Sequence, residues 1–171
     1  MLHAPQQDSG LRFLENLAHL VPGYHGYKHP GSRREEDARL RARVYRQIRQ
    51  MLAVMVRLEQ RWSHQAAEPL QAELGRRLAE LRTLADSVRF APGEQCHFFR
   101  QEAIAETALE KLLEADLLIL ADLEETAGHV ALEPRISAAP RTGRAFLRRL
   151  QELLQRLEQH LIRRERVLSG G

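Results

Sequence analysis

The hydrophobic positions of this chain recur every three or four residues over long stretches, which is the period of an α-helix. The clearest stretch runs from about residue 32 to 63 and carries one continuous apolar stripe. Its members are Leu40, Val44, Ile48, Met51, Met55, Leu58 and Trp62. This spacing predicts a helix of about thirty residues, roughly 45 Å long.

Three more long helices are predicted from stripes of the same kind, over about residues 68–90, 98–130 and 142–168. The inward positions are Leu70, Leu74, Leu78, Leu81, Leu84 and Val88, then Ile104, Ala108, Leu112, Ala115, Ile119 and Leu123, then Phe146, Leu150, Leu153, Leu157 and Leu161. A shorter stripe predicts a short helix over about 10–20. Glycine and proline are frequent in residues 21–32, which predicts a loop.

The chain shows no alternation of apolar and polar residues of the kind that marks β-strands. Four long helices joined by short connections are typical of a bundle. We therefore expect an all-α fold, an antiparallel helical bundle of four long helices plus a short N-terminal helix. A chain of 171 residues has the size of a single domain, so we expect one domain over residues 1–171.

The remaining bulk features favour a soluble, cytoplasmic protein. Cys96 is the single cysteine, so no internal disulfide is expected and a reducing compartment is favoured. The first ten residues lack the basic and apolar regions of a signal peptide. The longest apolar run, residues 117–121, is too short to span a bilayer.

Charge is distributed unevenly along the chain. Residues 28–61 contain ten basic and four acidic side chains, residues 65–133 contain six and fourteen, and residues 141–171 contain eight and three. Of the 26 cationic residues, 24 are arginine, whose guanidinium suits carboxylate or phosphate partners. The first and last long helices are therefore basic, and the middle of the chain is acidic.

An acidic ladder occupies one face of the predicted third long helix, with carboxylates every four residues. Its members are Glu102, Glu106, Glu110 and Glu114. Like charges at this spacing oppose helix formation, so cations are expected alongside. Arg39, Arg43 and Arg46 on the first long helix, and Arg144 and Arg148 on the last, are the candidates. We interpret the ladder as a set of structural ion pairs between helices.

No catalytic set is evident in the sequence, and we expect a protein that is not an enzyme. Phosphate-binding glycine loops and nucleophile elbows are missing. A di-metal bundle needs two Glu-x-x-His motifs, and the chain has one, from Glu94 to His97. His19, His25 and His29 do not have a recognised metal-ligand spacing. We expect no metal and no cofactor.

The segment Val21-Pro-Gly-Tyr-His-Gly-Tyr-Lys-His-Pro-Gly-Ser32 is the least ordinary part of the sequence. It displays two tyrosines, histidines and a lysine on a glycine-hinged loop that leads into a basic helix start. One interpretation is a docking loop, because tyrosine supplies contact area at low entropic cost. Its candidate partner-binding residues are Tyr24, His25, Tyr27, Lys28, Arg33 and Arg34. The other interpretation is a plug, in which both rings fold back onto the open end of the bundle.

The same residues carry a resemblance. Pro22-Gly23-Tyr24-x-Gly26-Tyr27, followed by Arg33-Arg34-x-x-Asp37 and Leu40-Arg41, resembles the opening of a family of small helical bacterial proteins with the pattern PGYxGY…RRxxDxxLR. A second region around residues 112–118 is similar to a later stretch of that family. The resemblance implies a helical fold, a bacterial source and a role for the loop, and it implies no activity.

Two functions follow as expectations. The first is a non-enzymatic, adaptor-like interaction or assembly protein that docks a protein partner or a second copy through residues 21–34. The alternative is a binder of an anionic surface, either nucleic acid or an acidic membrane, through the basic first and last long helices. The acidic middle of the chain favours the first, because it would compensate much of the positive field. Peripheral membrane contact by the short helix stays open.

Overall fold

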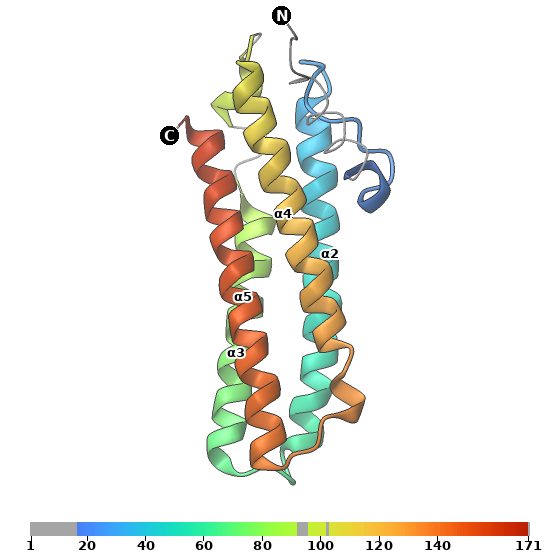
Figure 1. Cartoon of the computed structure of the whole chain (residues 1–171), viewed down its shortest axis with the longest axis vertical. Coiled ribbons are helices and arrows are strands. Elements are labelled where there is room, and N and C mark those ends of the chain that lie inside the picture. The colour runs from blue at the N-terminus through green and yellow to red at the C-terminus, as the bar shows by residue number, and fades with distance from the viewer. Residues whose placement is uncertain (1–16, 92–95, 102, 171) are drawn as a thin grey trace, which may run out of the picture. The chain divides into compact units, whose positions relative to one another are not determined.

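The computed structural model describes residues 17–91, 96–101 and 103–170, and all regular secondary structure in these ranges is helical (Figure 1). The long helices are α2 (Arg33–Trp62), α3 (Glu68–Phe90), α4 (Glu106–Val130) and α5 (Pro140–Ser169). Two short 3-10 helices, η1 (His97–Arg100) and η2 (Glu133–Arg135), precede α4 and α5. The predicted all-α fold with four long helices is confirmed, and the described residues contain no strand.

Helix boundaries agree closely with the sequence pattern at three of the four long helices. The apolar stripe of α2 is buried at every predicted position from Leu40 to Trp62, and so is the stripe of α3 from Leu70 to Val88. Pro69 lies in the first turn of α3, where its missing N–H costs nothing. Of the predicted short helix at 10–20, residues 17–20 are helical and the others lie outside the described residues. None of the described helices combines the length and apolar composition needed to cross a membrane.

The third long helix begins later than predicted, at Glu106 rather than near residue 98. Residues 97–100 form η1, and the Gln101 amide N–H donates to the Phe98 carbonyl oxygen. The Gln101 carbonyl oxygen accepts a hydrogen bond from the Arg33 Nη1 at 2.7 Å instead of from a helical amide. A side chain distant in sequence thus competes with the helix at this point, which local periodicity does not reveal.

The described residues form two compact units, each built from segments distant in sequence. Unit 1 contains residues 17–43, 96–101, 103–120 and 160–170, and unit 2 contains residues 44–91 and 121–159. Helices α2, α4 and α5 contribute residues to both units, so the units are not successive domains along the chain. The single domain over residues 1–171 stays a prediction.

Unit 2 has an apolar core contributed by all four long helices. Trp62, at the end of α2, is fully buried. A Cβ added at Gly143 would lie 2.7 Å from a methyl carbon of Leu70 and 3.0 Å from the Trp62 ring. The missing side chain therefore allows the first turn of α5 to pack directly against the start of α3.

Unit 1 has an aromatic core formed by the loop before α2 and by η1. Tyr24 and Tyr27 meet edge to face at 5.8 Å between ring centroids, and Tyr27 stacks on Phe99 at 5.6 Å. Gly23 and Gly26 have φ values of 76° and 77°, which L side chains rarely adopt. These two glycines turn the loop so that both tyrosine rings enter the core.

Candidate functional site

Helices α2, α4 and α5 each place a charged side chain inside unit 1. Asp37 of α2, Asp116 of α4 and Arg164 of α5 are 1%, 0% and 5% exposed. The Arg164 Nη2 donates to Asp37 Oδ1 and its Nε donates to Asp116 Oδ1, both at 2.6 Å. Arg41 Nε donates to the other oxygen of Asp37 at 2.7 Å. Two carboxylates are thus matched by two guanidinium groups.

The loop tyrosines complete this arrangement. The Tyr27 hydroxyl donates to Asp116 Oδ2 at 2.7 Å, and the Tyr24 hydroxyl donates to the same oxygen at 3.2 Å. Arg164 Nη2 donates to the Tyr27 hydroxyl oxygen at 3.1 Å. We call these six residues the buried network: Tyr24, Tyr27, Asp37, Arg41, Asp116 and Arg164. It ties the loop to α2, α4 and α5 within unit 1.

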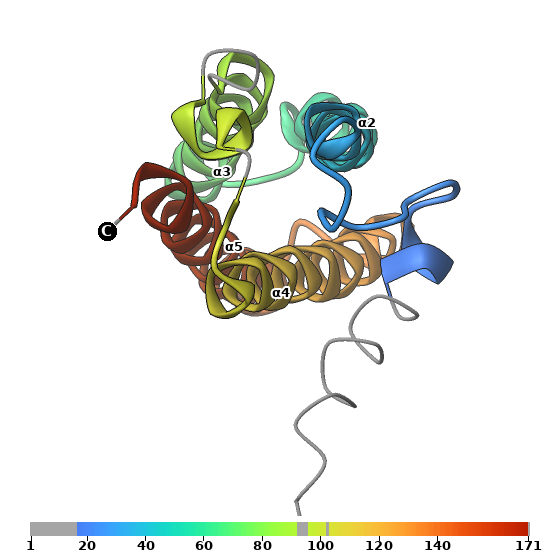
Figure 2. The same cartoon turned by 90° about the horizontal axis from the view of Figure 1, so that it is seen from above.

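Arg33 fixes the backbone of the same loop from the first residue of α2. Its Nε donates to the Tyr27 carbonyl oxygen at 2.9 Å, and its Nη1 donates to the Gln101 carbonyl oxygen. The side chain is 3% exposed. Figure 2 shows the loop beside the start of α2, where the Arg33 side chain holds its backbone.

Two further bonds hold the loop backbone to α2. The His25 amide N–H donates to Glu36 Oε2 at 3.0 Å, and the Arg39 guanidinium donates to the Gly23 carbonyl oxygen. Ser32, the residue before α2, donates its hydroxyl to the His29 carbonyl oxygen at 3.3 Å. The helix start is thus held by long side chains that reach back to the loop.

The protonation state of the buried network follows from its burial and its charges. Burial raises the pKa of Asp116, and the Arg164 guanidinium opposes that rise. Burial, together with the nearby Asp116 carboxylate, raises the pKa of both tyrosines well above the ordinary value. Burial lowers the pKa of Arg164, but the contributions of Asp116, Tyr27 and Asp37 together raise it by more, so the net pKa is above its usual range. The tyrosines are neutral donors and Arg164 stays charged.

The polar groups of the buried network bind one another. Its hydroxyls donate to a carboxylate, and its carboxylates are engaged by guanidiniums. An activated nucleophile would need a lowered pKa or an adjacent free base. The tyrosines have raised pKa values instead, and the carboxylate that they meet is already occupied. The arrangement stabilises a conformation of the loop.

The candidate partner-binding residues of the loop therefore separate into two groups. Tyr24 and Tyr27 are 2% and 1% exposed, and Arg33 is also buried, so none of the three is a surface contact. For the two rings the plug interpretation agrees with the structure, because burial and the bonds to Asp116 face them inward. His25, Lys28 and Arg34 are exposed.

The acidic ladder is only partly described. Glu102 lies outside the described residues, Glu106 is exposed, and Glu110 is half-buried. Glu114 Oε2 lies 3.0 Å from Nη2 of Arg163 on α5, an arginine that was not among the expected partners. Among the expected cations, Arg39 contacts Glu36. Arg43 belongs to unit 1 and is half-buried, and Arg46 belongs to unit 2 and is exposed. Arg144 and Arg148 also belong to unit 2. Pairs between the ladder and Arg43 or Arg46 stay predictions.

The candidate metal ligands are not gathered into a site in the part of the chain that the structure describes. No group of three His, Cys, Asp or Glu side chains there has the proximity to hold a metal ion. Glu94 of the Glu-x-x-His motif lies outside that part. Cys96 is half-buried with its Sγ 3.7 Å from the Leu168 carbonyl oxygen, and His97 is exposed.

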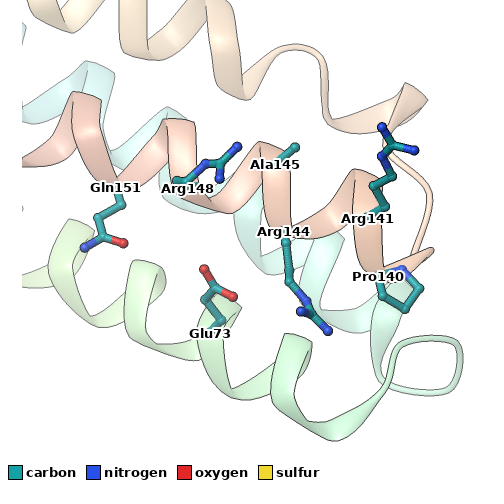
Figure 3. Close-up of a pocket in the computed structure, with 7 residues that line it drawn as sticks. All are labelled: Glu73, Pro140, Arg141, Arg144, Ala145, Arg148 and Gln151. Carbon is teal, nitrogen blue, oxygen red and sulfur yellow. The ribbon is translucent and has the colours of Figure 1, made fainter.

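A second candidate site lies in unit 2, where α3 and α5 line an open cavity of about 700 Å³ (Figure 3). We call it the arginine cavity, and its lining residues are Glu73, Pro140, Arg141, Arg144, Ala145, Arg148 and Gln151. Figure 3 shows Arg144 extending from α5 toward α3, and Glu73 extending from α3 toward α5. The three arginines are exposed and Glu73 is half-buried.

Sequence reasoning missed the roles of Asp37, Asp116 and Arg164, although a signal was present. Each occupies a position that continues an apolar stripe: Arg164 is three residues beyond Leu161, and Asp37 is three residues before Leu40. A charged residue at such a position enters the core, where it needs a partner. Three charged residues on three apolar stripes are therefore expected to be one another's partners.

Comparisons with protein-family models, with curated proteins and with solved structures found no match for this chain. The resemblance to the helical family with the PGYxGY opening stays a prediction. Within the described structure, however, the residues of that opening have a physical role. Its two tyrosines, its first arginine and its aspartate all make the buried contacts of unit 1.

Proposed function

We propose that this protein is a non-enzymatic interaction protein that docks an acidic segment of a protein partner through the exposed side of residues 21–34. The observation that carries the proposal is a loop without regular secondary structure that is nevertheless anchored by buried hydrogen bonds. Such anchoring reduces the ordering entropy lost on binding. Preorganised loops on a rigid scaffold are common binding elements.

The chemistry of the exposed side indicates the kind of partner. Lys28 and Arg34 are cationic and exposed, and His25 and His29 are exposed beside them. Arg33, Arg39 and the amide of His25 already bind acceptors within the chain. A partner would therefore meet Lys28 and Arg34 first, and carboxylates on that partner would complement them.

The alternative, an anionic surface bound by the whole first and last long helices, has weaker support. Many of the cations on these helices already bind acceptors in the chain: Arg33, Arg39, Arg41, Arg61, Arg149, Arg156, Arg163 and Arg164. The members of this group that meet carboxylates contribute little to a long-range positive field: Arg39, Arg41, Arg61, Arg149, Arg156, Arg163 and Arg164.

The test compares two charge-matched double variants of the full chain. Lys28→Glu/Arg34→Glu changes the exposed side of the loop, and Arg49→Glu/Arg57→Glu makes the same charge change at exposed positions of α2. Proteins captured from native lysate by the wild type are identified, and each is purified for affinity measurement. We expect the loop variant to weaken binding by about tenfold or more and the control by less than about threefold.

Two results would contradict the proposal. One is equal weakening by both double variants, which would indicate general charge attraction. The other is a captured partner whose affinity neither variant changes. Circular dichroism of both variants establishes that they keep the helical content of the wild type, since all four substitutions are on the surface.

A further inference from the structure

The arginine cavity of unit 2 combines uncompensated positive charge with concave shape. No ion pair or side-chain hydrogen bond to another described residue engages Arg141, Arg144 or Arg148. Farther along α5, by contrast, Arg149 contacts Glu125 and Glu152, and Arg156 contacts Asp122 and Glu125. We propose that the arginine cavity binds a hydroxyl-bearing organic polyphosphate of nucleoside di- or triphosphate size.

The spacing of the arginines suits more than one phosphate group. Arg141, Arg144 and Arg148 are separated by three and four residues, which is about 4.5 and 6 Å of rise along a helix. A guanidinium presents a planar fork of donors that binds phosphate oxygens in a bidentate manner. The positive end of the helix dipole at Pro140, the first residue of α5, adds to the same field.

The shape of the site favours a small ligand over a polymer or a membrane. A volume of about 700 Å³ lies within the range of about 300–1,000 Å³ that is usual for small-molecule sites. A lipid surface or a nucleic-acid backbone would instead be met by a flat or convex array of cations. Charge and concavity together indicate a compact polyanion.

Glu73 indicates the chemistry of the rest of the ligand. Glu73 has no ion pair or side-chain hydrogen bond with another described residue, although it shares the cavity with Arg144. Its carboxylate would repel a phosphate placed against it, and it accepts hydrogen bonds from hydroxyl or amino groups. A ligand with phosphates at one end and hydroxyls at the other satisfies both walls. The sugar and phosphates of a nucleotide have this arrangement.

The experiment is isothermal titration calorimetry of the full chain with ATP and with inorganic tripolyphosphate, both in magnesium-free buffer. We expect ATP to bind at one site per chain with an affinity that falls as salt rises. Arg144→Gln/Arg148→Gln should weaken ATP binding by about tenfold or more. The matched control, Arg163→Gln/Arg166→Gln, removes the same charge from α5 outside the cavity and should change affinity less than about threefold. Lys28→Glu/Arg34→Glu should leave ATP binding unchanged, which separates this site from the loop.

Glu73→Gln tests the orientation of the ligand. Tripolyphosphate, which has no hydroxyl for Glu73, should bind the wild type more weakly than ATP. The substitution removes the repulsive negative charge and leaves a weaker, neutral amide acceptor, so tripolyphosphate should bind more tightly and its disadvantage relative to ATP should shrink. Three results overturn the proposal: no ATP binding by the wild type at millimolar concentration, equal losses in both arginine double variants, or binding of duplex DNA or anionic vesicles that depends on Arg144 and Arg148 and is not displaced by ATP. The last would assign the arginines to an extended surface.

Discussion

The arginines of unit 1 and those of the arginine cavity in unit 2 are used in opposite ways, although α5 supplies members of both. Arg164 is buried and binds two carboxylates and a hydroxyl. Arg144 and Arg148 are exposed and no described carboxylate lies within ion-pair distance of either. The difference is set by the neighbours. In unit 1, Asp116 of α4 and Asp37 of α2 lie within reach of Arg164, and this arginine is buried in the core. In unit 2, Glu73 of α3 lies across the cavity from the arginines of α5, which remain available to bind a ligand.

This contrast distinguishes charges that maintain the fold from charges that are available for binding. A buried ion pair is costly to form, but removing one partner leaves the other charge buried and unpaired. An exposed arginine can be removed with little effect on stability. Substitution within α5 should therefore separate the two groups by free energy of unfolding.

The largest effect is expected for Arg164→Ala. The substitution leaves Asp37 and Asp116 buried without their shared guanidinium, and a loss of about 3–5 kcal/mol in the free energy of unfolding is expected. Urea denaturation of the full chain measures it. Arg148→Ala is the control and should change stability by less than about 0.5 kcal/mol. Similar values for the two variants would remove the distinction between buried and available arginines.

A smaller loss is expected for Tyr27→Phe. The ring stays in place, but Asp116 loses its 2.7 Å hydroxyl donor, and Arg164 loses an acceptor. Leaving buried polar groups unsatisfied costs about 1–3 kcal/mol. Tyr45→Phe is a matched control, since Tyr45 is half-buried and its hydroxyl has no hydrogen bond to another described residue. Equal stabilities of the two variants in urea would show that the Tyr27 hydroxyl contributes nothing.

Lowering the pH should change the stability contributed by Asp116 in unit 1 and by Glu125 in unit 2 in opposite directions. Burial raises the pKa of Asp116, so the folded state binds a proton at higher pH than the unfolded chain. The wild type should therefore gain stability relative to Asp116→Asn as pH falls from the raised folded pKa toward the unfolded value of about 3.9. Hydrogen bonding to Arg156 lowers the pKa of Glu125. Stability from Glu125 is present above its unfolded pKa, and it is lost as pH falls through the lower folded pKa.

Urea denaturation between pH 7 and pH 3 measures both effects against Asp116→Asn and Glu125→Gln. The stability difference between wild type and Asp116→Asn should grow on acidification, and that between wild type and Glu125→Gln should shrink. A shrinking difference for Asp116 would mean that Arg164 outweighs burial and that the carboxylate pKa is lowered.

The smallest effect is expected at the surface of unit 1. Glu114 and Arg163 form an ion pair at 3.0 Å with both side chains more than 40% exposed. A double-mutant cycle with Glu114→Gln and Arg163→Gln should give a coupling of about 0.2–1 kcal/mol. Raising the salt concentration should reduce the coupling further. A coupling as large as the Arg164→Ala loss would contradict the assignment of this pair to the surface.

The helices could be predicted from the sequence because their stripes are local. Leu40, Met55 and Trp62 are buried as their spacing indicates, and Pro69 lies in the first turn of α3, where proline is tolerated. The start of α4 could not be predicted in this way. Its position depends on Arg33, which is 68 residues away from the Gln101 carbonyl oxygen that it binds.

Only part of the candidate site could be predicted from the sequence. The loop was recognisable from Tyr24 and Tyr27, but the direction of the rings depends on Asp116, 89 residues beyond Tyr27. Arg164 occupies a position that continues an apolar stripe, which indicates burial, yet nothing in the nearby sequence identifies its acceptors. The arginine cavity depends on the close approach of α3 and α5, which the small residue Gly143 allows.

The buried network also limits when the contacts of unit 1 can form during synthesis of the chain. Arg164 binds Tyr27 across 137 residues and Asp37 across 127 residues. During translation, Asp37 and Asp116 are both synthesised before the Arg164 guanidinium that joins them. Contacts of such high sequence separation cannot assist early folding, and nascent chains with unmet polar groups and exposed apolar faces are prone to association. Helix α5, which is synthesised after α2 and α4, is therefore the one that completes unit 1. Chains shortened before Arg164 would have Asp116 without a guanidinium partner and Asp37 with Arg41 alone, and they would be targets for cellular quality control.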